Sequence, residues 1–356
     1  MITLSTSNAG FAPIALAHAG AYAHMQAQDF IKLAYQHANG CEHMVRMSPE
    51  IARWIENERE SGDGVHFEPI GNGYVRAHLS GAEASISSDL LARMFVTSAK
   101  MHAKKENALE NALCTLSDLA AQNRLPVSAC EMETALSAYR AMGCPAVHHS
   151  DRFRESYSPH YRVLNRFFAD YAEVFTALDR LRTEKPGAII AIDGMCASGK
   201  TTLARYISEV FDAPVYHMDD FFLRPEMRTE ARLNEPGGNV DRERFYEEIL
   251  APLSRGERFT YRPFDCSTMS LGQPIDCTPA PLNIVEGAYS CHPDLIGHYD
   301  FIVCIAIDKD LQVSRIRRRN GDTMLRRFVN EWIPMENRYL DTFCIADHAD
   351  LAYQIL

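Results

Sequence analysis

The stretch Gly194–Thr201 reads GMCASGKT and decides the fold class of the second half of the chain. It fits the phosphate-binding pattern G-x-x-x-x-G-K-[ST] at every fixed position. The glycines of this pattern permit a tight turn whose successive N–H groups face phosphate oxygens. Its lysine brings a positive charge to the β- and γ-phosphates, and its threonine hydroxyl suits Mg²⁺. The predicted nucleotide contacts are therefore Gly194, Cys196, Ala197, Ser198, Gly199, Lys200, Thr201 and Thr202.

The sequence on either side of this loop supports phosphate binding. An apolar run, Ala188–Ile192, precedes the loop and predicts a strand, and Thr201–Phe211 predicts the helix that follows it. Such a helix presents its free N-terminal N–H groups and the positive end of its dipole to an anion. A chance or purely structural match would rarely fall between a strand and a helix.

The residues after 187 alternate between apolar runs and helical stretches. This alternation predicts βαβ units and a parallel sheet that is covered on both faces. The predicted strands are Ala188–Ile192, Ala213–His217, Leu282–Val285 and Phe301–Ile307, and the predicted helices include Thr201–Phe211 and Arg242–Leu253. The predicted fold class is α/β, a P-loop NTPase with a doubly wound parallel sheet.

The residues before 183 have a mostly helical pattern. The Pro-Gly pair in Thr183–Gly187 marks the point where this pattern ends. We therefore predict a mostly helical α+β domain of unknown role over residues 1–183 and a P-loop domain over residues 184–356. The elements expected upstream are helices over 104–122, 131–142 and 163–181, a helix start at Ser88, and a turn with a short strand over 71–79.

Two carboxylate positions follow predicted strands, at the sheet edge where open α/β sheets bind ligands. Asp219 and Asp220 come just after Ala213–His217, and Glu286 comes directly after Leu282–Val285. We expect an aspartate to orient or deprotonate an acceptor hydroxyl, and Glu286 to serve a metal ion. The alternatives are a helix N-cap for the aspartates and a strand-ending surface position for Glu286.

A dense basic run, Arg315–Arg319, lies further downstream, with Arg326 and Arg327 beyond it. In an acidic chain such a run predicts a lid whose arginines neutralise charge on a transferred phosphoryl group. We expect Arg315 and Arg318 to contact the nucleotide and Arg319 to act in catalysis. The alternative is a solvated basic helix face.

Together these residues resemble the uridine kinase, phosphoribulokinase and pantothenate kinase branch of the P-loop kinases, over residues 188–350. Asp219–Phe222 resembles the family segment whose aspartate is the catalytic base, which implies that role for Asp219 and leaves Asp220 open as the alternative. Glu286 and Gly287 match the Glu-Gly pair that ends the family's Walker B element. A closer resemblance, to a bacterial uridine kinase-like group, rests on three stretches, His217–Pro225, Glu235–Asn239 and Arg319–Gly321.

The acceptor side resembles the family in part. Pro263–Asp265 is similar to a shortened P-x-Y-D segment, and Asn239–Asp241 is similar to the stretch before the acceptor-side helix. Residues 266–271 lack the histidine and arginine with which uridine kinases hold the nucleoside, so the resemblance implies phosphoryl transfer without implying a nucleoside acceptor. Arg224 would suit an anionic acceptor, and an exposed arginine that binds nothing is the alternative. The expected substrate contacts are Asp219, Asp220, Asp241, Asp265 and Arg224.

We therefore expect an ATP- and Mg²⁺-dependent kinase that phosphorylates a hydroxyl of a nucleoside, sugar or related metabolite. A regulatory P-loop ATPase that controls the N-terminal domain is the alternative, and the net charge of -11 disfavours a polynucleotide kinase. The ten cysteines form no CxxC pair, which predicts reduced thiols and a cytoplasmic location. The expected partner is a small-molecule acceptor rather than a membrane or nucleic acid, and a homodimer is left open.

The N-terminal half contains a polar cluster at His148–Arg162, which is rich in histidine, arginine and tyrosine. We expect a second polar segment, Gln36–His43, to join it and build an anion or substrate pocket. The alternative is an irregular, hydrogen-bonded loop between helices. No spacing typical of a zinc site occurs in this half.

Overall fold

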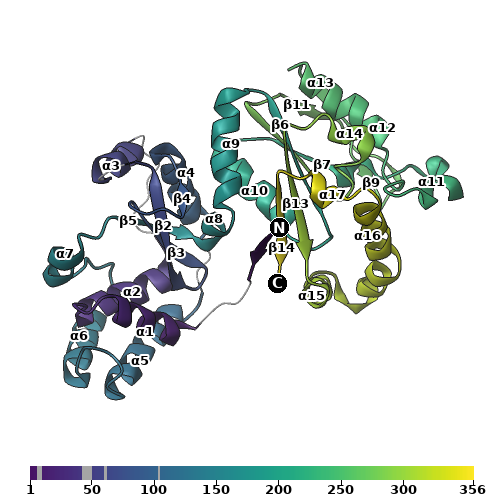
Figure 1. Ribbon diagram of the computed structural model, residues 1–356. Coiled ribbons are helices and arrows are strands. Elements are labelled where there is room, and N and C mark those ends of the chain that lie inside the picture. The colour runs from purple at the N-terminus through teal and green to yellow at the C-terminus, as the bar shows by residue number, and fades with distance from the viewer. Residues whose placement is uncertain (6–9, 42–49, 60–61, 103–104) are drawn as a thin grey trace. The chain divides into compact units, whose positions relative to one another are not determined.

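The computed structural model describes residues 1–5, 10–41, 50–59, 62–102 and 105–356 (Figure 1). The chain divides into two compact units. The N-terminal unit comprises residues 7–176, and the P-loop unit joins residues 1–6 to residues 177–356. The boundary lies within a single helix, α9 (Ala172–Glu184). Among the described residues, no helix combines the length and apolar character that a membrane crossing requires.

A six-stranded sheet forms the centre of the P-loop unit, with the strand order β1-β14-β13-β6-β12-β7 (Figure 1). Every neighbouring pair in this sheet is parallel. The strands are β1 (Ile2–Leu4), β6 (Ala188–Gly194), β7 (Val215–His217), β12 (Leu282–Glu286), β13 (Phe301–Ile307) and β14 (Leu351–Ile355). The α/β fold class expected from the sequence is confirmed.

The two central strands, β6 and β12, are buried along their whole length. Strands that are covered on both faces need apolar side chains on both, which explains their continuous apolar runs. The helices of this unit are α10 (Lys200–Phe211), α11 (Glu230–Asn234), α12 (Arg242–Phe245), α13 (Ala251–Ser254), α14 (Pro293–Ile296), α15 (Lys309–Arg327), α16 (Ile333–Thr342) and α17 (Ile345–His348). Two antiparallel ribbons pair β8 (Phe259–Tyr261) with β11 (Ile275–Cys277) and β9 (Phe264–Asp265) with β10 (Ser270–Leu271).

The first strand of the chain belongs to the sheet of the second half. Ile2 pairs with Tyr353 and Leu4 with Ile355, so β1 lies beside β14 at the sheet edge (Figure 1). This pairing satisfies backbone N–H and C=O groups that an edge strand would otherwise leave open. The division of the chain therefore differs from the predicted domains, 1–183 and 184–356, in two places: the N-terminal residues join the P-loop unit, and the boundary falls inside α9.

The N-terminal unit combines a small antiparallel sheet with helices. The sheet has the order β4-β2-β3-β5, formed by β4 (Ala84–Ser85), β2 (Gly64–Gly71), β3 (Tyr74–His78) and β5 (Tyr161–Asn165). The helices are α1 (Phe11–Ala21), α2 (Ala27–Asn39), α3 (Glu50–Glu58), α4 (Ser88–Lys100), α5 (Ala108–Ala121), α6 (Ala129–Ala141), α7 (Asp151–Tyr157) and α8 (Arg166–Asp170). The helix start at Ser88 and the turn and strand over 71–79 are confirmed; residue 104, the first of the helix predicted over 104–122, lies outside the described residues.

One predicted helix of this unit, residues 163–181, is wrong at its start. Val163 and Leu164 lie in β5, where they pair with Arg76 and Val75 of β3. The helix pattern begins only at α8, where the Asn165 side chain accepts a hydrogen bond from the N–H of Phe167. Strand pairing with a distant partner therefore overrides the helical spacing of the apolar residues here.

Candidate active site

The loop Gly194–Thr201 forms a tight turn between β6 and α10. Gly194 has φ of 132°, and a Cβ there would lie 2.1 Å from the backbone oxygen of Ile305. Gly199 has φ of 112°, in the region that favours glycine, and Ala197 also has a positive φ of 58°. The first-turn N–H groups of α10 have no acceptor within the helix, so they are free to bind an anion at this loop.

Lys200 folds back over this loop. Its ammonium group donates to the backbone oxygens of Gly194, at 2.8 Å, and Met195, at 2.9 Å. The side chain is 8% exposed, so the charge is held close to the loop rather than in bulk water. A buried ammonium on the inner side of such a loop is placed to meet phosphate oxygens.

Side chains from α15 and α16 hold the loop from outside. The Glu336 carboxylate accepts from the N–H of Cys196 at 2.7 Å, and Gln312 Nε2 donates to the oxygen of Cys196 at 3.0 Å. Arg315 donates to the backbone oxygens of Ala197 and Ser198 at 3.0 and 3.3 Å. Arg315, predicted to contact the nucleotide, is thus placed as a loop anchor by these bonds. Burial raises the pKa of Glu336, and the nearby charge of Lys200 opposes the rise.

A fully buried carboxylate, Asp193, anchors the end of β6. It accepts from the N–H groups of Gly194 at 2.6 Å and Cys291 at 2.8 Å, and from the Tyr339 hydroxyl at 2.7 Å. These bonds tie the strand end to the segment after β12 and to α16. Sequence reasoning missed Asp193 and Glu336; the position of Asp193 at the end of an apolar strand was a usable signal, whereas nothing local marks Glu336.

Two oxygen-bearing side chains, Thr201 and Glu286, lie close together beside the loop. The Thr201 hydroxyl lies 3.2 Å from one Glu286 carboxylate oxygen and 3.3 Å from the other. His217 Nδ1 lies 2.5 Å from the same carboxylate, and this hydrogen bond raises the pKa of His217 against the effect of burial. Within the described part of the chain, no group of three or more His, Cys, Asp or Glu side chains could hold a metal ion. Thr201 and Glu286 still fit Mg²⁺, which in phosphate sites takes one or two protein oxygens together with phosphates and water.

Asp219 lies in the short turn after β7 and interacts electrostatically with Lys200 and Glu286. Burial raises the pKa of Asp219, although the side chain keeps solvent contact; the Glu286 carboxylate adds to the rise and Lys200 opposes it. The neighbouring Asp220 accepts from the Tyr261 hydroxyl at 2.9 Å. Of the two aspartates, Asp219 is therefore the one whose pKa responds to the charges of Lys200 and Glu286.

The other predicted site residues make contacts outside the phosphate-binding loop. Asp241 is buried and caps α12 by accepting from the N–H of Arg244, which places it in the interior rather than at an open surface. Asp265 is exposed and accepts from Ser267, and Arg224 lies 3.5 Å from Glu226.

Arg318 and Arg319 are exposed on α15, which breaks at Gly321 with φ of 76°. Arg319 donates to Asn320 and interacts electrostatically with Cys196 of the loop.

Solved kinase structures resemble about half of the chain. A protein from Bacillus stearothermophilus described as a possible uridine kinase is 21% identical, with 51% of this chain and 99% of that chain covered and a TM-score of 0.38. A protein from Silicibacter sp. TM1040 described as a fructose transport system kinase is 23% identical, with 51% and 97% covered and a TM-score of 0.41. Shikimate kinase from Bacteroides thetaiotaomicron is 15% identical, with 47% and 86% covered and a TM-score of 0.25. No family model and no curated protein matches the chain.

Proposed function

We propose that the P-loop unit transfers the γ-phosphate of ATP, with Mg²⁺, to a hydroxyl group of a small metabolite. The observation that carries the proposal is the convergence of Lys200, Glu286 and Asp219 at the carboxyl ends of β6, β12 and β7. A phosphate-binding loop alone would serve an ATPase as well. An aspartate in the neighbouring turn would supply the group that an acceptor hydroxyl requires.

The residues around the loop have distinct proposed roles toward Mg-ATP. The N–H groups of Ser198–Thr202 and the Lys200 ammonium would hold the phosphates, and Thr201 and Glu286 would hold the metal. Mg²⁺ held there would supply positive charge that offsets the negative charge of the phosphates. Hydrogen bonds to Asp193 and Glu336 stabilise the turn of the loop. The N–H groups of the loop would therefore be oriented before the nucleotide binds.

Asp219 is the proposed base. Its carboxylate would accept the proton of the acceptor hydroxyl as that oxygen attacks the γ-phosphate, and a raised pKa makes a carboxylate a better base. Arg319, next to the break at Gly321, is proposed to approach the transferred phosphoryl group when the second half of α15 moves. Arg228 and Cys266 interact with each other electrostatically, and Cys266 also interacts with Asp219, so these side chains border the proposed acceptor position.

The proposed acceptor is a nucleoside, a sugar or a related metabolite, and the proposed location is the cytoplasm. All ten cysteines are unpaired, as expected of thiols in a reducing compartment. Asp220, Asp265 and Arg224 stay candidate acceptor contacts. Asp241 would act through the placement of α12, because its carboxylate caps that helix.

The test is ADP release from Mg-ATP across a panel of nucleosides, sugars, vitamins and their phosphates. We expect one acceptor class to raise ADP release, and Asp219→Asn to lower that rate by about 10²–10⁴-fold while ATP binding is kept. The matched control is Asp212→Asn, because Asp212 ends α10 at φ of 54°, a conformation that asparagine adopts readily. The control should release ADP like the wild type.

Acceptor-independent ADP release that Asp219→Asn leaves unchanged would contradict the kinase proposal. That result would favour the alternative, an ATPase whose nucleotide state acts on the N-terminal unit. Loss of ATP binding in Asp219→Asn would instead mean that Asp219 supports the nucleotide site, so binding is measured separately by calorimetry.

A further inference from the structure

The N-terminal unit contains a cavity of about 220 Å³ that the phosphoryl-transfer site does not explain. Strand β3 forms one side, and α7 together with the segment that leads into β5 forms the other. The polar cluster predicted at His148–Arg162 contributes several of the lining side chains. Residues 42 and 43 of the second predicted polar segment, Gln36–His43, lie outside the described residues. Gln36 of that segment forms hydrogen bonds with two lining residues, Arg76 and Tyr161.

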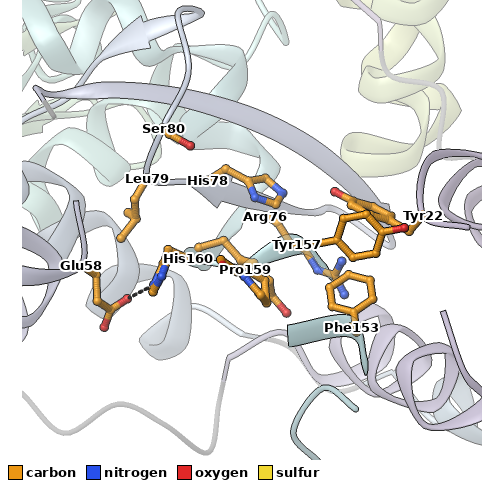
Figure 2. A pocket seen from close by; sticks show the side chains of 12 residues that line it. Tyr22, Glu58, Arg76, His78, Leu79, Ser80, Phe153, Tyr157, Pro159 and His160 are labelled. Atoms are coloured by element: carbon orange, nitrogen blue, oxygen red, sulfur yellow. Dashed lines mark ion pairs between the residues drawn. The ribbon is translucent and has the colours of Figure 1, made fainter. Parts of the chain in front are cut away.

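The centre of the cavity is a buried guanidinium group. Arg76 is 1% exposed and lines the cavity, where Figure 2 shows its side chain among those of Phe153, Tyr157 and His160. Nε and Nη2 both donate to Gln36 Oε1, at 3.0 and 2.8 Å, and Nη1 donates to Glu68 at 3.2 Å. A guanidinium group has five N–H hydrogens. The bonds to these described residues use three of them, which leaves one hydrogen on Nη1 and one on Nη2.

Two carboxylates, Glu68 beside Arg76 and Glu58 in the cavity lining, already have cationic partners. Glu68 accepts from His78 at 3.1 Å as well as from Arg76, and His18 lies 3.5 Å away. Burial alone would raise the pKa of Glu68, but His78 and Arg76 hold it down at about 2. Glu58 accepts two bonds of 2.8 Å from Arg162. These carboxylates therefore have little capacity left to attract a cation.

Aromatic rings form one wall of the cavity. Tyr22, Phe153 and Tyr157 pack against one another with ring centroids 4.8 to 5.2 Å apart, and they gather on one side of Arg76 in Figure 2. The Tyr157 hydroxyl accepts from the N–H of His24 at 3.1 Å, so its own hydrogen is available to a ligand. The rings pack in tilted and edge-to-face arrangements, and a wall of aromatic rings favours a flat or apolar ligand surface.

The guanidinium is held in place before any ligand binds. It lies over the ring of Tyr161, 4.7 Å from the centroid. The Tyr161 hydroxyl is fixed in turn by His149 Nε2 at 2.7 Å and by Gln36 Nε2 at 3.3 Å. A donor that is already desolvated and oriented loses little entropy on binding, which raises the affinity for a matching acceptor.

We propose that this cavity binds a small metabolite with one carboxylate group attached to a flat or apolar ring. The two remaining N–H groups of Arg76 would bind the carboxylate, and the rings of Tyr22, Phe153 and Tyr157 would contact the rest of the ligand. One guanidinium matches the single negative charge of a carboxylate better than the two charges of a phosphate dianion. The volume is below the range of about 300–1,000 Å³ that drug-sized ligands occupy, so the ligand is small.

The test is calorimetric titration of the full chain with benzoate and nicotinate, compared with benzamide, nicotinamide and inorganic phosphate. We expect the carboxylates to bind about tenfold or more tightly than the matching amides and than phosphate. Arg76→Lys keeps the charge but loses the forked pair of donors, and we expect it to weaken carboxylate binding by a similar factor.

Ser80 provides a second variant, because Arg76 is buried and its replacement can disturb folding. Ser80 lines the cavity and is exposed at its edge, so Ser80→Phe should block carboxylate binding while the unit stays folded. Ser137→Phe, on the exposed face of α6, is the matched control and should bind like the wild type. Equal affinity for benzoate and benzamide, unchanged binding in Ser80→Phe, or no binding of either carboxylate at millimolar concentration would overturn the proposal.

Discussion

The buried carboxylate of Asp29 accepts a hydrogen bond from Nδ1 of His149 across 2.9 Å. A carboxylate only accepts, so the hydrogen lies on Nδ1, and Nε2 is left to accept from the Tyr161 hydroxyl at 2.7 Å. Asp29 also accepts from the N–H and hydroxyl of Ser150. This pair thus links α2, the start of α7 and β5.

Acid should destabilise the N-terminal unit through His149. Burial lowers the pKa of His149 from 6.5 to about 4 against the effect of Asp29. The unfolded chain therefore binds a proton below pH 6.5 that the native unit does not take up until about pH 4. Native stability should be full above pH 6.5 and fall as the pH drops through this window, by up to about 3 kcal/mol.

Urea unfolding at pH values above and below this window would measure the effect. The chain has two tryptophans, so Trp332→Phe leaves Trp54 of α3 as a fluorescent reporter of the N-terminal unit. His149→Gln, which removes the titrating group, should flatten the pH dependence of the unfolding free energy. An equal pH dependence in the wild type and this variant would show that His149 is not its source.

Gly194→Ala should destabilise the P-loop unit and abolish nucleotide binding. The added Cβ would lie 2.1 Å from the oxygen of Ile305, at a φ that alanine rarely adopts. Steric overlap and backbone strain together should cost about 2–5 kcal/mol. Gly297→Ala is the control, because Gly297 has φ of -69° and open space around its Cβ position. Trp332 fluorescence in a Trp54→Phe background reports the unfolding, and equal stability of the two variants would contradict the argument.

Glu336 should matter to the loop as a hydrogen-bond acceptor more than as a charge. Glu336→Gln keeps an oxygen for the Cys196 N–H and removes a negative charge near the phosphates, so ATP affinity should be equal or higher. Glu336→Ala leaves that buried N–H without its acceptor, at a cost of about 1–3 kcal/mol, and ATP affinity should fall. Calorimetric titration with ATP measures both, and Glu331→Ala, at an exposed position nearby, is the control. Equal losses in Glu336→Gln and Glu336→Ala would mean that the charge itself is required.

Removal of residues 2–5 should destabilise the P-loop unit although they precede the N-terminal unit in sequence. The deletion takes β1 away from β14 and leaves backbone groups of the edge strand without partners. The expected loss is about 1–3 kcal/mol in the unfolding free energy reported by Trp332. Replacing only the exposed Met1 by Ala is the control. If Trp54 fluorescence reports the loss of unfolding free energy instead, β1 stabilises the N-terminal unit and the prediction is wrong.

Local patterns in the sequence were enough to predict the P-loop and four of the six strands of its sheet, with β1 and β14 missed. The glycines, the lysine and the apolar run around Gly194–Thr201 specify a turn and a central strand through backbone conformation and burial, which are properties of neighbouring residues. The carboxylates Asp219 and Glu286 were predictable for the same reason, since each follows a recognisable strand. Their meeting at one sheet edge follows from parallel pairing.

Tertiary structure alone decided the parts that join residues distant in sequence. The pairing of Ile2 with Tyr353, the contact of Glu336 with Cys196 and the burial of Arg76 beside Gln36 and Glu68 depend on packing and hydrogen bonding across long separations. Local sequence patterns do not mark these residues. The strand Ile2–Leu4 is too short to show a period, and Glu336 and Arg76 are single polar residues. The sequence by itself therefore determined that a phosphate-binding α/β unit is present, and the fold determined which distant side chains hold its loop and which enclose the second cavity.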